Sequence, residues 1–192
     1  MDDRLTRALK LVAVALAIAF VGWAVYEKFV VDVAPGDMAY HSANRLFEDG
    51  YYERAAAAYR EALEEAPDHL DALRGMARSL HLAGAQEEAL ALYDEAIARA
   101  PEFGPTYANR GILLDTMGRH EEALADYMRA LELDPELAEG PSWLTRFLRK
   151  QAEAPPTIAD RAAYLRAELA KPEGERVLRV PEIDAQQRPY QQ

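Results

Sequence analysis

The sequence predicts an all-α protein, in which an apolar N-terminal helix precedes a right-handed solenoid of three two-helix repeats with capping helices. Two observations lead to this prediction. Prolines recur at Pro67, Pro101 and Pro135, a spacing of 34 residues twice over, and self-similarity at that period is typical of stacked helix pairs. Nearer the N-terminus, the chain also has an uncharged run of sixteen residues from Leu11 to Tyr26.

The apolar run is almost long enough to cross a bilayer, which takes about 20 predominantly apolar residues. We therefore expect residues 11–31 to form a single transmembrane helix. Arg4, Arg7 and Lys10 precede it, so the positive-inside rule keeps residues 1–10 in the cytoplasm and exports the rest. The expected location is the inner membrane of a bacterium, with the repeats in the periplasm.

Two alternatives to the anchor stay open. Gly22, Trp23 and Ala24 resemble a small-x-small cleavage site, so the segment could instead be a signal peptide that is removed. The bulky Trp23 and the apolar residues 29–31 that follow favour the anchor. The other alternative is a buried helix of a soluble domain. The chain has no cysteine, which argues against a lipid anchor in place of the helix.

A linker at residues 32–35 leads into three units, at residues 36–69, 70–103 and 104–137. Each unit is predicted to be a helix, a turn and a second helix. A glycine in the turn allows the left-handed backbone that ends the first helix. Small alanines let the two helices approach closely, and a tyrosine fills the gap toward the neighbouring unit. The positions that recur in phase are Gly50, Gly84 and Gly118; Ala55, Ala89 and Ala123; Tyr59, Tyr93 and Tyr127; and Ala62, Ala96 and Ala130.

These matched positions resemble the tetratricopeptide repeat (TPR) family. The second halves of the three units read GYYERAAAAYREALEEAP, GAQEEALALYDEAIARAP and GRHEEALADYMRALELDP. The resemblance implies an interaction scaffold that holds other proteins and is not an enzyme. It does not identify the partner.

Two further segments follow the repeats. Residues 138–153 are predicted to form a capping helix that begins a partial fourth repeat, because Trp143, Leu144 and Phe147 fall on one helical face. Residues 154–192 are expected to hold a helix from about 158 to 170, which starts at a sequence resembling a capping box, and then an extended tail. The sequence leaves open whether that tail is poorly ordered, packs along the solenoid or lies on a partner.

Composition and motifs exclude several classes of function. The net charge of −11 argues against nonspecific binding to nucleic acid, which requires a basic surface. The four histidines show no paired metal-binding spacing, and no glycine-rich phosphate loop follows a strand. We therefore expect no catalytic site, no cofactor and no metal.

One set of polar residues is a candidate binding site. The resemblance places five residues along the concave groove of units two to four: Arg74, Arg78, Asn109, Arg146 and Lys150. Some TPR domains use such positions to hold the two carboxylates at the C-terminal end of a peptide. Four of the five residue types match that clamp, and Arg78 stands where the clamp has asparagine. The expected ligand is an acidic or C-terminal segment of a protein partner. The alternative is that these residues are solvated or paired within the molecule.

The sequence thus favours a membrane-tethered adaptor that binds another protein through its groove or its tail and supports assembly of an envelope complex. The alternative is a permanent accessory subunit of a larger membrane complex, held there by its transmembrane helix and tail.

Overall fold

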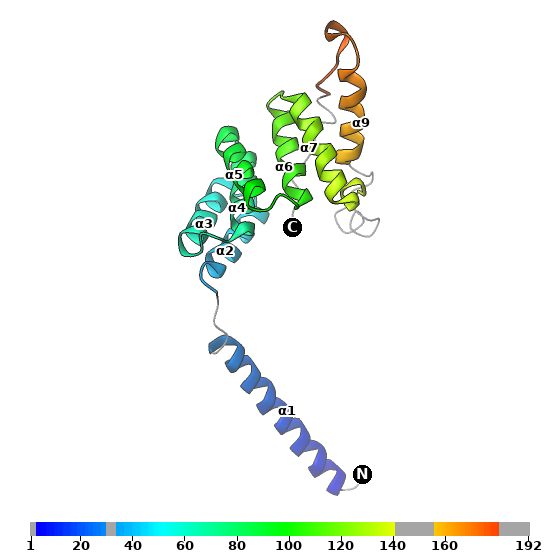
Figure 1. Cartoon of the computed structure of the whole chain (residues 1–192). Coiled ribbons are helices and arrows are strands. Elements are labelled where there is room, and N and C mark those ends of the chain that lie inside the picture. The colour runs from blue at the N-terminus through cyan, green and yellow to red at the C-terminus, as the bar shows by residue number, and fades with distance from the viewer. Residues whose placement is uncertain (1–2, 30–33, 141–155, 181–192) are drawn as a thin grey trace.

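The computed structural model describes residues 3–29, 34–140 and 156–180, and the regular structure in those ranges is entirely helical (Figure 1). A long first helix, α1 (Asp3–Phe29), precedes three helix pairs, and a last α-helix follows them after a 3-10 turn. The remaining bounds are α2 (Asp37–Glu48), α3 (Tyr52–Glu65), α4 (Leu70–Ala83), α5 (Gln86–Arg99), α6 (Gly104–Thr116), α7 (His120–Leu133), η1 (Pro135–Ala138), α9 (Ile158–Leu169) and η2 (Glu173–Glu175).

The turn inside each pair has the backbone that the sequence predicts. Gly50, Gly84 and Gly118 have φ angles of 80°, 87° and 80°, in the left-handed region that favours glycine. The recurring prolines follow the second helix of each pair two residues beyond its last helical residue. The period of 34 residues therefore marks where the second helix of each pair ends.

The recurring alanines and tyrosines form the packed interior, as predicted. All nine residues of these three classes have no exposed surface: Ala55, Ala89, Ala123, Ala62, Ala96, Ala130, Tyr59, Tyr93 and Tyr127. The ring of Tyr59 lies so close to Gly75 of α4 that a Cβ there would meet a ring atom at 2.4 Å. Tyr59 thus fills the space between the first pair and the second.

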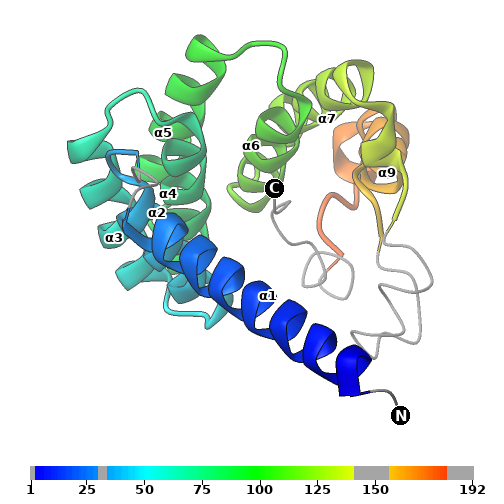
Figure 2. The ribbon, with the colours of Figure 1, turned by 90° about the horizontal axis from the view of Figure 1, so that it is seen from below.

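The buried apolar residues form two clusters. The first joins α2, α3, α4 and α5, and the second joins α6, α7, η1 and α9. Figures 1 and 2 show the same two groups of helices lying side by side. Leu113 of α6 belongs to the first cluster, Met117 at the end of α6 packs against it, and Leu90 of α5 packs against both clusters, so these three residues join the halves.

The last α-helix packs against α7 and η1 and ends the described solenoid. Its start is the predicted capping box: the Thr157 hydroxyl accepts from the Asp160 backbone N–H, and the Asp160 carboxylate accepts from the Thr157 backbone N–H. Its buried face carries Ile158, Ala162 and Leu165.

The chain then returns along α9 as residues 176–180. The Val177 N–H donates to Glu168 Oε2 at 2.8 Å, the Val177 carbonyl accepts from the Tyr164 hydroxyl at 2.6 Å, and Arg179 donates to the Thr116 carbonyl at 2.8 Å. The described part of the tail therefore packs on the solenoid, which is one of the arrangements that the sequence left open.

Other expectations are not settled by the structure. The predicted capping helix at 138–153 lies outside the described residues except for 138–140. Of these three, Ala138 is the last residue of η1 and the other two follow it directly. Among the described residues, none of the helices has both the length and the apolarity needed to span a membrane. The anchor at 11–31 and the proposed unit boundaries therefore stay predictions.

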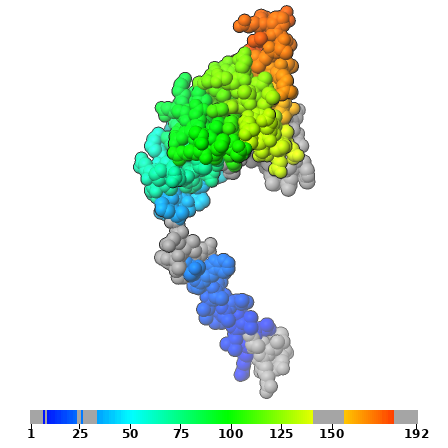
Figure 3. All heavy atoms as spheres, viewed as in Figure 1, coloured from blue at the N-terminus to red at the C-terminus, as the bar shows by residue number. Residues whose placement is uncertain are grey.

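Helix α1 extends away from the repeats (Figures 1 and 3), and every side chain described on it is exposed. Its exposed residues include Leu11 at 71%, Phe20 at 76% and Trp23 at 68%.

Candidate protein-binding site

Helix α4 carries the first two residues of the predicted groove, Arg74 and Arg78, one turn apart. Both are buried, with exposed fractions of 7% and 6%. Arg74 donates to Asp71 on the same helix at 2.9 Å, and its guanidinium lies 3.9 Å from the ring centre of Phe103. The guanidinium of Arg78 lies 5.1 Å from the ring centre of Phe47. Both guanidinium groups thus lie beside an aromatic face, where a cation is stabilised.

Arg78 also lies close to the hydroxyls of two of the repeat tyrosines. Burial raises the pKa of Tyr59 to about 12, while the charge and hydrogen bonding of Arg78 act in the opposite direction. Burial likewise raises the pKa of Tyr93, against the charge of Arg78. The Tyr59 hydroxyl donates to Asn44 of α2, whereas the Tyr93 hydroxyl is buried and finds no hydrogen-bond partner. The surroundings of Arg78 are therefore polar and largely shielded from water.

The structure places the other three predicted residues as follows. Asn109 lies on α6 and is 1% exposed. Arg146 and Lys150 lie outside the described residues. The structure therefore puts Arg74 and Arg78 on one helix and Asn109 on the first helix of the next pair, and the role of all five in binding stays a prediction.

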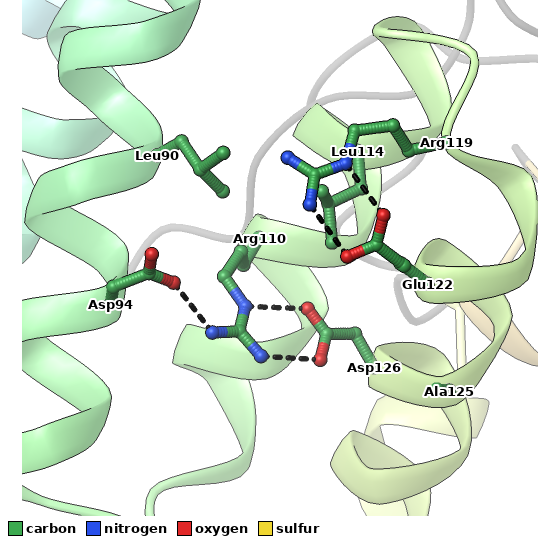
Figure 4. A pocket seen from close by; sticks show the side chains of 8 residues that line it. All are labelled: Leu90, Asp94, Arg110, Leu114, Arg119, Glu122, Ala125 and Asp126. Atoms are coloured by element: carbon green, nitrogen blue, oxygen red, sulfur yellow. Dashed lines mark hydrogen bonds and ion pairs between the residues drawn. The ribbon is translucent and has the colours of Figure 1, made fainter.

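A second polar cluster, which the sequence did not indicate, lies between the second and third pairs. Arg110 of α6 donates to both carboxylate oxygens of Asp126 at 2.7 Å, and to Asp94 of α5 at 2.6 Å (Figure 4). These hydrogen bonds, those to Asp126 first, raise the pKa of Arg110 above its ordinary value. Arg119 and Glu122 form a neighbouring pair that is more exposed.

These charges surround a cleft of about 360 Å³. Leu90 and Leu114 supply its apolar part, and every charged side chain that lines it is paired with another. The periodicity did not indicate this cleft, because its charged residues Asp94, Arg110 and Asp126 do not recur at the 34-residue spacing.

A third polar cluster is buried between α6, α7 and α9. Asp115 accepts two hydrogen bonds from Arg161, and His120 Nδ1 lies 2.8 Å from the same carboxylate. Arg161 also donates to the Leu178 carbonyl at 2.9 Å. The only sequence signal was a charged residue in the apolar run of α6, and its partner lies 46 residues away.

No group of three or more histidine, cysteine, aspartate or glutamate side chains within the described ranges is arranged to hold a metal ion. The three clusters consist of ion pairs and aromatic contacts, which suit binding and structural support.

Comparison with known families agrees with the helix pairs and their spacing. One family model described as tetratricopeptide repeat matches residues 46–109, and another of the same description matches residues 105–137. The chain is a tetratricopeptide repeat protein. The TPR family is typically a non-enzymatic scaffold for protein–protein interaction.

Solved TPR structures share the fold. The first TPR of Spaghetti (RPAP3), bound to the HSP90 peptide SRMEEVD, is 24% identical with a TM-score of 0.51, over 64% of this chain and 94% of that one. The Arabidopsis OM64 TPR domain is 18% identical with a TM-score of 0.51, over 61% and 93% of the two chains. The Naa15/Naa10 complex bound to HypK-THB contains a chain that is 27% identical, with a TM-score of 0.51. The match covers 70% of this TPR protein but only 18% of that much longer chain. No curated protein matches the chain at a significant level.

Proposed function

We propose that this TPR protein is a membrane-tethered adaptor that binds an acidic or C-terminal segment of another protein at Arg74 and Arg78. The observation that carries the binding part is the pair of buried arginines, one turn apart on α4, in a chain whose net charge is −11. Burying a positive charge is costly unless an opposite charge compensates it. Asp71 provides such a charge for Arg74, and a partner carboxylate would supply another.

Unfilled hydrogen-bonding capacity supports the same site. Among the residues that the structure describes, none forms a hydrogen bond with the buried Nε of Arg74 or with the buried hydroxyl of Tyr93. Buried polar groups are rarely left in this state, and both of these atoms can donate to a carboxylate oxygen. The acidic peptide held by the RPAP3 domain shows that a ligand of this chemistry binds to a related fold.

The membrane part of the proposal is supported by the surface of α1. From Leu11 to Trp23 this helix carries no charged residue on any side, and all of these side chains are exposed. A helix that is apolar all round is stable when it is buried in a large core or a membrane, and the repeats do not cover α1. The cations at Arg4, Arg7 and Lys10 favour a cytoplasmic N-terminus, which would place the repeats in the periplasm.

The same surface also suits a permanent accessory subunit, because an apolar helix can pack among the transmembrane helices of a larger complex. Extraction in mild detergent separates the two functions. A free adaptor purifies alone, whereas a subunit co-purifies in fixed stoichiometry with one complex.

The binding site is tested by co-purification from native membranes. The double change Arg74→Ala with Arg78→Ala should lower recovery of the partner by well over tenfold, because each hydrogen bond to a charged group contributes about 1.5–3 kcal/mol. The exposed pair Arg54→Ala with Arg60→Ala makes the same change in net charge and should leave recovery unaltered. Undiminished recovery with a folded Arg74 and Arg78 variant would rule out this site and leave the tail, residues 171–192, as the better candidate.

A further inference from the structure

The third helix pair carries charged residues at two positions where the second pair carries apolar ones. We call the region where α5 faces α6 the seam. Met76 is buried in the first apolar cluster, and Leu92 packs against that cluster. The residues 34 positions later are Arg110 and Asp126, which form an ion pair. An ion pair thus stands in the third repeat at two positions that are apolar and associated with the first cluster in the second repeat.

Packing across the seam is correspondingly weaker. Helices α5 and α6 share fewer contacts than α3 and α4, which face each other at the equivalent place one repeat earlier. The two apolar clusters also divide here, and the cleft of about 360 Å³ opens between α5, α6 and α7 (Figure 4). Apolar packing across the division involves Leu90, which packs against both clusters, and Leu113 and Met117 of the third pair, which pack with the first cluster.

Arg110 is held on the two sides of the seam with unequal strength. Toward its own half it makes two hydrogen bonds to Asp126, whose side chain is 8% exposed. Toward the other half it makes one hydrogen bond to Asp94, whose side chain is 56% exposed. An exposed ion pair such as that between Arg110 and Asp94 contributes little to stability and weakens in salt. The bond that crosses the seam is therefore the weaker one.

We propose that the seam is a hinge. The helices from α2 to α5 move as one body, and α6, α7, η1 and α9 move as another, about the apolar packing of Leu90, Leu113 and Met117. The cross-seam ion pair between Arg110 and Asp94 limits the opening of the cleft, and Arg110 stays with Asp126 when that pair breaks.

The hinge changes the geometry of the proposed binding site. Arg74 and Arg78 lie on α4, on one side of the seam. Asn109 lies on α6, on the other side, next to Arg110 in the sequence. Bending would alter the separation of these residues and let the site adjust to its partner. This consequence depends on the proposed function, but the hinge itself does not.

The sequence contains no cysteine, which permits a matched test with introduced cysteines. Glu64, Ala98 and Glu132 are exposed, occupy the same position in successive repeats, and lie on α3, α5 and α7. Spin labels are attached to the double variant Glu64→Cys with Ala98→Cys, and to the double variant Ala98→Cys with Glu132→Cys. Pulsed electron paramagnetic resonance then gives the distribution of distances across each contact, with no partner present. The first pair of labels is the control, since it spans the apolar contact.

We expect the distribution across the seam to be broader than the control distribution. It should broaden further in Asp94→Asn and in about 1 M salt, where the Debye length falls to about 3 Å. Replacing Arg110 and Asp126 by the residues of the preceding repeat, Arg110→Met with Asp126→Leu, should narrow the distribution across the seam to the control width. Equal widths for the two label pairs, with no response to salt or to Asp94→Asn, would overturn the hinge whether or not the protein binds a partner at Arg74 and Arg78.

Discussion

The carboxylate of Asp115 on α6 accepts two hydrogen bonds from the guanidinium of Arg161 on α9, from Nε at 2.7 Å and from Nη2 at 3.0 Å. The two side chains are 3% and 1% exposed, so the pair is almost completely removed from water. Arg161 also holds the Leu178 carbonyl, and through it residues 176–180. This pair therefore attaches the last helix and the returning chain to the third repeat.

Breaking this pair should destabilise the C-terminal half. Asp115→Asn leaves the buried charge of Arg161 without its partner, and the expected loss is about 3–5 kcal/mol in the free energy of unfolding. Urea unfolding measures that loss, and amide hydrogen exchange should show it first in α9. The double change Asp115→Leu with Arg161→Met removes both charges and should cost less than the single change. A loss as large in the double variant would mean that packing, not the unpaired charge, causes the effect.

The second prediction concerns the contact between the first two repeats. Gly75→Ala places a Cβ against the buried ring of Tyr59, which has no room to move away. The expected cost is about 1–3 kcal/mol, as for other overpacked cores. Thermal unfolding checks it, and Gly174→Ala, whose Cβ would meet nothing within 4 Å, is the control. Equal melting temperatures for the two variants would contradict the tight contact.

A third prediction tests the close-packed position inside the second repeat. Ala89 has no exposed surface, so Ala89→Leu should overpack the pair and cost roughly 1–3 kcal/mol. Because each repeat contacts only its neighbours, the damage should spread to both sides and spare α1. Ala98→Leu, on the exposed face of the same helix, should leave the melting temperature nearly unchanged.

The fourth prediction is a dependence of stability on pH. Burial lowers the pKa of His81 from 6.5 to about 4, and its Nδ1 is buried without a hydrogen-bond partner. As the pH falls, the unfolded chain therefore takes up the proton before the folded protein does. The stability that the neutral His81 contributes is complete above pH 6.5 and is lost as the pH falls toward 4. The loss is on the order of 3 kcal/mol. Unfolding in urea at several pH values should show that loss in the wild type but not in His81→Leu. A control variant at an exposed histidine, His41→Asn, should follow the wild type. Parallel curves for the wild type and His81→Leu would contradict the prediction.

The last prediction concerns the N-terminal helix. If residues 11–31 anchor the protein, its intact mass in native membranes should include the first residues, and the repeats should be cut by protease only from the non-cytoplasmic side. Loss of about the first 24 residues would instead indicate a cleaved signal peptide.

The sequence alone determined the repeat fold, because its signals act within one unit or between adjacent ones. A glycine such as Gly84 sets the left-handed turn, Ala89 the close approach of two helices, and Tyr93 the packing beside them. Each depends on neighbours at fixed separations, so a period of 34 residues was enough to place them all. The capping box at Thr157 could be read for the same reason.

Only the tertiary structure decided how the charged residues pair. Asp115 and Arg161 lie 46 residues apart, in segments that share no period, and Arg110 bonds to two different helices. The sequence placed Arg74 and Arg78 on one helix, but their burial against Phe103 and Phe47 depends on how the repeats stack. A periodic pattern records which positions are equivalent, whereas an ion pair depends on which side chains meet in space. The polar seam, the buried pair under α9 and the shielded arginines therefore emerged from the packed structure.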